Sequence, residues 1–97
     1  MTISWKNSDD NLVFLIGKLS QTTVTSLLPI KKQLQTYNDE LNIDLSQLTN
    51  VDSAGLAYLV ELKEYCDKHK IDVCFKNATN ALIKLIALYN AETLLEN

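Results

Sequence analysis

The stretch NIDLSQLTNVDSAGLAYLVEL, residues 42–62, decides the fold of this chain. Alternating apolar and polar side chains at its start predict a central β-strand over residues 41–45. An irregular connection is expected over residues 46–51, followed by a long helix. Asp52 or Ser53 is the expected N-cap, because a short oxygen-bearing side chain can accept a hydrogen bond from an unpaired amide of the first turn. The junction therefore places a hydroxyl and a carboxylate together at a helix N-terminus.

Three further apolar runs predict strands on either side of this junction. They cover residues 3–6, 12–16 and 71–75. Gly17 is expected to end the second of these strands. The long helix should reach about His69, close to lysines that suit a helix C-terminus.

A shorter helix is predicted between the second and third strands. Its apolar residues begin at Leu27, and Thr25 or Ser26 is its expected cap. Pro29 then lies in its first turn, where the missing amide hydrogen costs little. The helix is expected to end near residues 37–39.

A last helix is predicted to follow the final strand. It begins at Thr79 or Asn80, and Asn90 is expected to end it in a left-handed conformation. Its inner apolar stripe is expected to comprise Leu82, Leu85, Ile86 and Tyr89. The tail 92–97 carries no pattern that assigns it to an element.

The predicted order of elements is β-β-α-β-α-β-α, within one α/β domain over residues 1–97. Strands joined by crossover helices pack as parallel neighbours with right-handed connections. The first two strands form a hairpin, so the four-stranded sheet is expected to be mixed. Helices are expected to cover one of its faces.

Composition narrows the range of functions. The chain has 97 residues and a net charge of −3, and its nine basic residues are all lysines scattered along the sequence. This composition argues against nucleic-acid partners and against binding to anionic lipid. Neither a signal peptide nor a stretch of about 20 apolar residues is present, so we expect a soluble cytoplasmic protein with no direct membrane insertion. Cys66 and Cys74 should then be reduced, small hydrophobic residues.

The sequence shows no arrangement of residues that is typical of a catalytic site. His69 is the only histidine, and it follows Ser53 by more than about four helical turns, so a serine–histidine nucleophile is not indicated. No cysteine–histidine spacing indicates a metal site, and no glycine-rich loop indicates a bound phosphate. We therefore expect no enzyme activity, no metal and no cofactor.

The predicted long helix presents three sides at 100° per residue. One side is its core stripe: Leu56, Leu59 and Cys66. The opposite side combines small and acidic residues into a surface suited to a partner: Ser53, Ala57, Val60, Glu61 and Glu64. A flank between them carries Tyr58, Leu62, Tyr65 and His69. Tyrosine is common at interaction hot spots, so the flank either joins the interface or packs beneath a neighbouring segment.

The central segment resembles the STAS domain family. The points of likeness are IDLS at 43–46, VDS at 51–53 and GL at 55–56, each in its expected element, and the resemblance covers Trp5 to Tyr89. The family includes anti-sigma-factor antagonists and cytoplasmic domains of some anion transporters. The resemblance implies a STAS fold and a role in binding other proteins.

Within the family, the isolated domain with LLP at 27–29 and LIALYN at 85–90 resembles a stand-alone subunit of a bacterial ABC transporter of phospholipids, which supports outer-membrane lipid asymmetry. This implies binding to the cytoplasmic ATPase subunit and, through it, indirect association with the inner-membrane permease. The residues then expected to contact the partner are Ser53, Ala54, Ala57, Tyr58, Val60, Glu61 and Tyr65.

Two other functions remain open. In sigma-regulating members of the family, the hydroxyl that matches Ser53 is phosphorylated by a partner kinase, which makes an anti-sigma-factor antagonist the alternative. Ala54 departs from that pattern, because many such members carry a second hydroxyl there. A carrier that encloses an acyl chain is disfavoured, since a chain of this length can hardly enclose both a core and a large cavity.

Overall fold

The computed structural model describes residues 2–9, 11–34 and 39–95. Its strands are β1 (Ile3–Asp9), β2 (Leu12–Leu19), β3 (Glu40–Asp44), β4 (Leu48–Val51) and β5 (Asp72–Lys76). Its helices are the 3-10 turn η1 (Val24–Leu27), α1 (Ile30–Leu34), α2 (Ser53–Lys68), α3 (Asn80–Leu88) and the 3-10 turn η2 (Glu92–Leu95).

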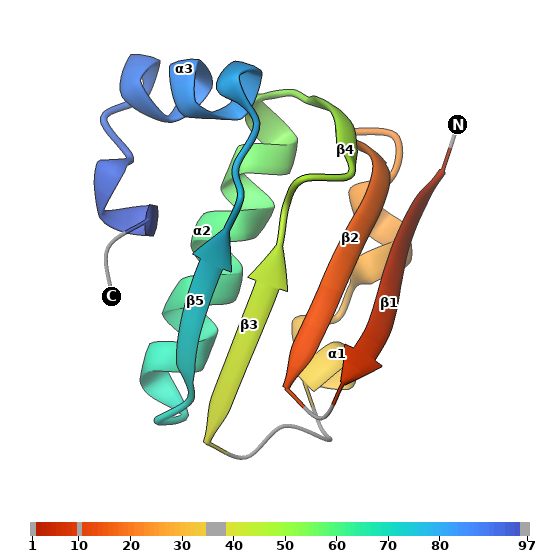
Figure 1. Cartoon of the computed structure of the whole chain (residues 1–97), viewed down its shortest axis with the longest axis vertical. Coiled ribbons are helices and arrows are strands. Elements are labelled where there is room, and N and C mark those ends of the chain that lie inside the picture. The colour runs from red at the N-terminus through yellow and green to blue at the C-terminus, as the bar shows by residue number, and fades with distance from the viewer. Residues whose placement is uncertain (1, 10, 35–38, 96–97) are drawn as a thin grey trace.

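The sheet is mixed, as the order of elements predicts. β1 pairs antiparallel with β2, while β3 lies parallel to both β2 and β5, giving the order β1-β2-β3-β5. Figure 1 shows α1 and α2 behind one face of the sheet, with α3 beyond the end of β5 at the top of the view and η2 beside β5. None of the described helices covers the opposite face in that view. The chain therefore has a two-layer α/β architecture, which confirms the predicted fold class.

The prediction of an irregular connection over residues 46–51 is wrong. β4 forms there and pairs parallel with the second half of β2, whose first half pairs with β3. Gly17 lies at this change of partner, inside β2 rather than at its end, with φ of 111°. A Cβ on Gly17 would collide with the carbonyl oxygen of Thr2, so glycine is required for this backbone. The sheet accordingly has five strands instead of the four predicted.

The prediction of a single helix that starts near residue 27 is also wrong, because the chain forms a 3-10 turn before α1. The 3-10 turn η1 begins at Val24 and ends at Leu27, and α1 begins only at Ile30. Pro29 lies between the two, in a cis peptide bond with Leu28, and not in a first helical turn. The expected caps Thr25 and Ser26 fall inside η1. The expected end of the helix near 37–39 falls largely outside the described residues.

The core lies between the sheet and α2. Leu15, Ile43 and Leu59 are fully buried, and the predicted α2 stripe of Leu56, Leu59 and Cys66 is confirmed. Burial, with a smaller contribution from the charge of Asp67, raises the pKa of the Cys66 thiol to about 11. Cys66 therefore stays a neutral, small hydrophobic side chain. Cys74 is half-buried on β5, and both cysteines are free.

The last helix follows its prediction except at its end. Thr79 caps α3 by accepting a hydrogen bond from the Leu82 amide, and Asn90 has the expected left-handed φ of 54°. Leu82 and Ile86 are buried, but Tyr89 is 54% exposed. Tyr89 is thus wrongly assigned to the inner stripe, because α3 ends at Leu88 and the chain turns away there.

Candidate partner-docking groove

The start of α2 is fastened to the loop after β2 by Asp52. Its Oδ1 accepts a hydrogen bond from the Gly55 amide at 2.9 Å, and its Oδ2 accepts one from the Gln21 amide at 3.0 Å. Asp52 is therefore the N-cap, one of the two predicted candidates. Ser53 becomes the first helical residue, and its side chain is exposed.

Hydrogen bonding keeps the Asp52 carboxylate ionised. The Gln21 amide and then the Gly55 amide lower the pKa of Asp52 below its usual value, against a smaller opposing effect of burial. A negative charge at this position also interacts favourably with the partial positive charge of the helix N-terminus. The cap is therefore fully formed at neutral pH.

Gly55 sets how closely α2 approaches the sheet. A Cβ at this position would collide with the carbonyl oxygen of Leu19 and would lie 2.9 Å from its carbonyl carbon. The glycine thus accommodates the chain's own β2 backbone. Together with Asp52, it fixes the position of Ser53 relative to β2.

A groove of about 750 Å³ runs along the outward side of α2. One wall comes from α2 itself, and its members are Ser53, Leu56, Ala57, Val60, Glu61, Lys63, Glu64 and Asp67. The other wall comes from the segment that follows α3, and its members are Tyr89, Asn90, Ala91, Thr93 and Leu94. The groove therefore lies between two segments that are far apart in the sequence.

The second wall is attached to the rest of the fold at two points. Lys63 Nζ donates a hydrogen bond to the Thr93 carbonyl oxygen at 2.6 Å, and the Leu94 side chain is buried, with 3% exposed. The left-handed turn at Asn90 redirects the chain between α3 and this wall. The wall is thus an integral part of the fold.

The charge of the groove is mainly acidic. Glu61, Glu64 and Asp67 lie along its α2 side, against a single cation, Lys63. The remaining lining is uncharged and includes the polar residues Asn90 and Thr93, while Ala57 is exposed and Val60 half-buried. A lining that combines apolar and acidic side chains suits a macromolecular surface of complementary charge.

The structure brings four of the predicted contact residues together in this groove. Ser53, Ala57, Val60 and Glu61 all line it. Ala54 lies in the first turn of α2, half-buried, and is not part of the lining. The predicted small and acidic surface of the helix is therefore a continuous feature in three dimensions.

Tyr58 requires a correction. Its side chain is only 3% exposed, and its hydroxyl donates a hydrogen bond to the Leu27 carbonyl oxygen at 3.1 Å. Burial, followed by a smaller effect of Cys66, raises the pKa of Tyr58 well above its usual value. Tyr58 therefore packs beneath η1, as the second alternative for this flank of the helix predicted. A buried side chain is not available to a partner, so the prediction of Tyr58 as a contact residue is wrong.

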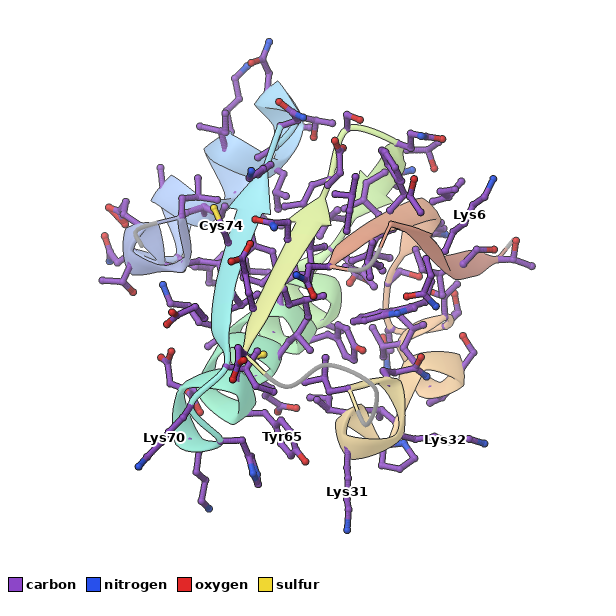
Figure 2. The ribbon with its side chains drawn as sticks, turned by 60° about the horizontal axis from the view of Figure 1, so that its bottom comes forward. Lys6, Lys31, Lys32, Tyr65, Lys70 and Cys74 are labelled. Carbon is purple, nitrogen blue, oxygen red and sulfur yellow. The ribbon has the colours of Figure 1, made fainter. Side chains whose placement is uncertain are left out.

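Tyr65 lies on the same flank, away from the groove. It is half-buried and stacks on His69, with ring centroids 4.1 Å apart and an angle of 28° between the planes. Figure 2 shows Tyr65 at the C-terminal end of α2, directed away from the sheet. Its role in partner binding stays a prediction, separate from the groove.

The wall formed by Tyr89 to Leu94 was missed by the sequence analysis. The sequence pattern predicts Tyr89 in the inner stripe of the last helix and assigns the tail 92–97 to no element. The signal available was the apolar pair Leu94–Leu95 inside an otherwise polar tail. Only the placement of that tail against α2 turns one helix face into a groove.

Other kinds of site are not indicated in the described ranges. No group of three or more histidine, cysteine, aspartate or glutamate side chains among residues 2–9, 11–34 and 39–95 is arranged to hold a metal ion. In the part of the chain that the structure describes, no helix combines the length and apolar content required to cross a bilayer.

Comparison with known proteins identifies the family. The family profile described as "Mlab, STAS domain" matches residues 5–96, nearly the whole chain. The chain belongs to the STAS domain family. The intermembrane phospholipid transport system binding protein MlaB of Escherichia coli K12 is 29% identical over 89 residues, covering 92% of this chain and 89% of that protein. MlaB of Haemophilus influenzae is 30% identical over 99 residues, covering 95% of this chain and 91% of that protein.

Solved structures agree on the STAS fold. The anti-sigma factor antagonist SpoIIAA in its unphosphorylated form superposes with a TM-score of 0.67 at 12% identity, covering 89% of this chain and 82% of that chain. At this identity the likeness concerns the fold alone. The chain is therefore similar in sequence to the MlaB proteins reported above and shares its fold with SpoIIAA.

Proposed function

We propose that this STAS domain is a non-catalytic accessory subunit of an ABC-type phospholipid transporter, and that it binds the cytoplasmic ATPase subunit, an MlaF-like protein, through the groove along α2. The similarity to MlaB proteins supports the transport system. The observation that supports binding through this face is the groove itself, since it gathers Ser53, Ala57 and Glu61 on one open surface.

The docked complex accounts for the expected location. The domain would be held at the cytoplasmic side of the inner membrane by the ATPase, which in turn contacts the permease. No contact of the domain itself with lipid is required. Its contribution would be to support the assembly and activity of the ATPase.

Affinity purification from native membranes tests this proposal. The domain, expressed at its normal level, is expected to retain an ABC ATPase and its permease after mild detergent extraction, as identified by mass spectrometry. Recovery of a kinase or an anti-sigma factor without any ATPase would contradict the transporter role.

A second candidate function rests on the exposure of Ser53 at the start of α2. In this alternative the domain is an anti-sigma-factor antagonist, and a partner kinase phosphorylates Ser53. The phosphate would add nearly two negative charges beside Asp52 and Glu61, and so would expel an acidic partner. Phosphopeptide mass spectrometry across growth conditions checks this, and an unmodified Ser53 in all of them would count against it.

A further inference from the structure

The walls of the groove indicate which kind of backbone can enter it. One wall is the side of a regular helix, and in the other the amides of Tyr89, Asn90 and Ala91 bond to carbonyl oxygens of α3. Because the amides of residues 89–91 are already hydrogen-bonded within the chain, this stretch of the second wall has no row of free amides to pair with an extended peptide. A segment that enters must satisfy its own backbone hydrogen bonds, and a helix does this.

The dimensions of the groove also suit a helix. Its α2 side runs from Ser53 to Asp67, about 21 Å at 1.5 Å per residue. The small side chains of Ala57 and Ala91 allow a close approach of backbones. Tyr89 and its neighbour Leu88 are 54% and 74% exposed, so the apolar surface continues beyond the groove. A helix of about four turns would cover this surface.

The acidic side chains of the groove indicate which charge the polar side of the incoming helix should carry. Glu61 and Glu64 are exposed, and no ion pair engages either side chain among the described residues. Lys63, the only cation of the lining, already donates its hydrogen bond to Thr93. Basic residues on the incoming segment would therefore find unopposed carboxylates on the rim.

We propose that the groove takes a single amphipathic helix of the partner, with its apolar side against Ala57 and Val60 and its lysine or arginine side chains against Glu61 and Glu64. This inference rests on the proposed function, since it names the chemistry of the ATPase segment that docks. It also explains why the domain keeps a groove that combines apolar and acidic side chains.

Photo-crosslinking tests the nature of the segment directly. The aromatic photo-crosslinker p-benzoylphenylalanine in place of Tyr89 lies on the wall of the groove, at a side chain that is 54% exposed and so leaves room for the added benzoyl group. Crosslinks formed with the co-purified ATPase are expected to map to one helical segment with a net positive charge. Crosslinks to an acidic or extended segment, or to a second copy of this chain, would overturn the inference.

Charge reversal tests the role of the rim. The double variant Glu61→Lys with Glu64→Lys is expected to weaken binding of the purified ATPase about tenfold or more and to reduce the dependence of binding on salt. The matched control, Asp39→Lys with Asp72→Lys, makes the same change in net charge at exposed positions outside the groove lining. The control is expected to bind as the parent does, and both doubles should keep the parent melting temperature within a few degrees.

The outcomes separate the inference from the proposed function. If the ATPase binds the parent domain and the groove variant equally, the helix-and-charge inference is wrong while the accessory role stands. An equal loss in both double variants also contradicts it, since net charge alone would then explain the effect. If the parent domain binds no ATPase, the proposed function itself is wrong.

Discussion

Two sides of α2 in this STAS domain have residues that the sequence predicts to contact a partner, but only one of these sides is open in the structure. Ser53, Ala57 and Glu61 face an open groove, whereas Tyr58 is buried on a neighbouring side of α2. Both sides contain residue types found at protein interfaces. Helical spacing identifies which residues share a side, but not which side another segment covers.

The segment that makes the difference is η1. Its Leu27 carbonyl accepts the Tyr58 hydroxyl hydrogen bond, which requires the chain to bring together residues 31 positions apart. The other side of α2 also meets a distant segment, Tyr89 to Leu94, which is joined to α2 through Lys63 but leaves a groove between the two. Segments distant in the sequence thus bury the Tyr58 side of α2 and form the second wall of the groove on the other side.

The largest effect should come from removing the buried tyrosine. Tyr58→Ala is expected to lower the free energy of unfolding by about 3–5 kcal/mol, because it leaves a cavity beneath η1. Urea titration followed by circular dichroism measures the loss. If the variant loses less than about 1 kcal/mol, the Tyr58 side is not closed and the contrast between the two sides fails.

On the open side the expected effect is on binding. Ala57→Asp should reduce binding of the ATPase about thirtyfold or more, since a charge and extra volume enter the groove floor, while stability changes by less than about 0.5 kcal/mol. Isothermal titration beside thermal melts measures both. Ala81→Asp, an exposed alanine of α3 outside the groove lining, is the control and should leave binding intact. Unchanged binding by Ala57→Asp would mean that the partner uses another surface.

The helix start that both sides share depends on its cap. Asp52→Ala should lower the free energy of unfolding by about 1–2 kcal/mol, because the Gly55 and Gln21 amides lose their acceptor. The pKa of Asp52 is lower in the folded state, so its contribution is complete above the unfolded pKa of about 3.9 and is lost as pH falls through the folded pKa. Asp52→Asn should therefore flatten the loss of stability as the pH falls below about 4. An unchanged slope would assign the acid sensitivity to other carboxylates, such as Asp44, where burial raises the pKa but hydrogen bonds from Ser46 and Asn77 lower it overall.

The smallest effect concerns single hydroxyl groups. Tyr58→Phe should lower the free energy of unfolding by about 1 kcal/mol, since the Leu27 carbonyl loses its partner while the ring stays in place. Tyr65→Phe is the matched change at the half-buried tyrosine, and it should alter stability by less than about 0.5 kcal/mol. Equal losses in chemical denaturation would show that the two tyrosines do not differ as the structure indicates.

Short-range sequence patterns predicted the elements whose apolar spacing alone defines a buried face. The alternation in residues 41–45 and the helical stripe of Leu56 and Leu59 each identify an element that buries one face. β4 was missed because Thr49 and Asn50 are both exposed and only Leu48 is buried, so the segment shows no alternation. Its pairing depends on where β2 ends its contact with β3.

The sequence predicted one of the two walls of the candidate groove. The α2 wall follows from the side of a helix opposite its core stripe, which spacing alone defines. The wall of Tyr89, Thr93 and Leu94 depends on a turn at Asn90 and on the Lys63 hydrogen bond across 30 residues. No short-range pattern contains that information, so Tyr89 was placed in the core instead.

The position of η2 bears on how the domain can be handled in the laboratory. Thr93 and Leu94 form one side of the groove, so anything fused after Leu95 emerges beside the surface that should receive the partner. A purification tag or fluorescent protein at that end would compete with the partner for space. β1 begins at the opposite edge of the sheet (Figure 1), which makes the other terminus the place for a label that leaves docking undisturbed.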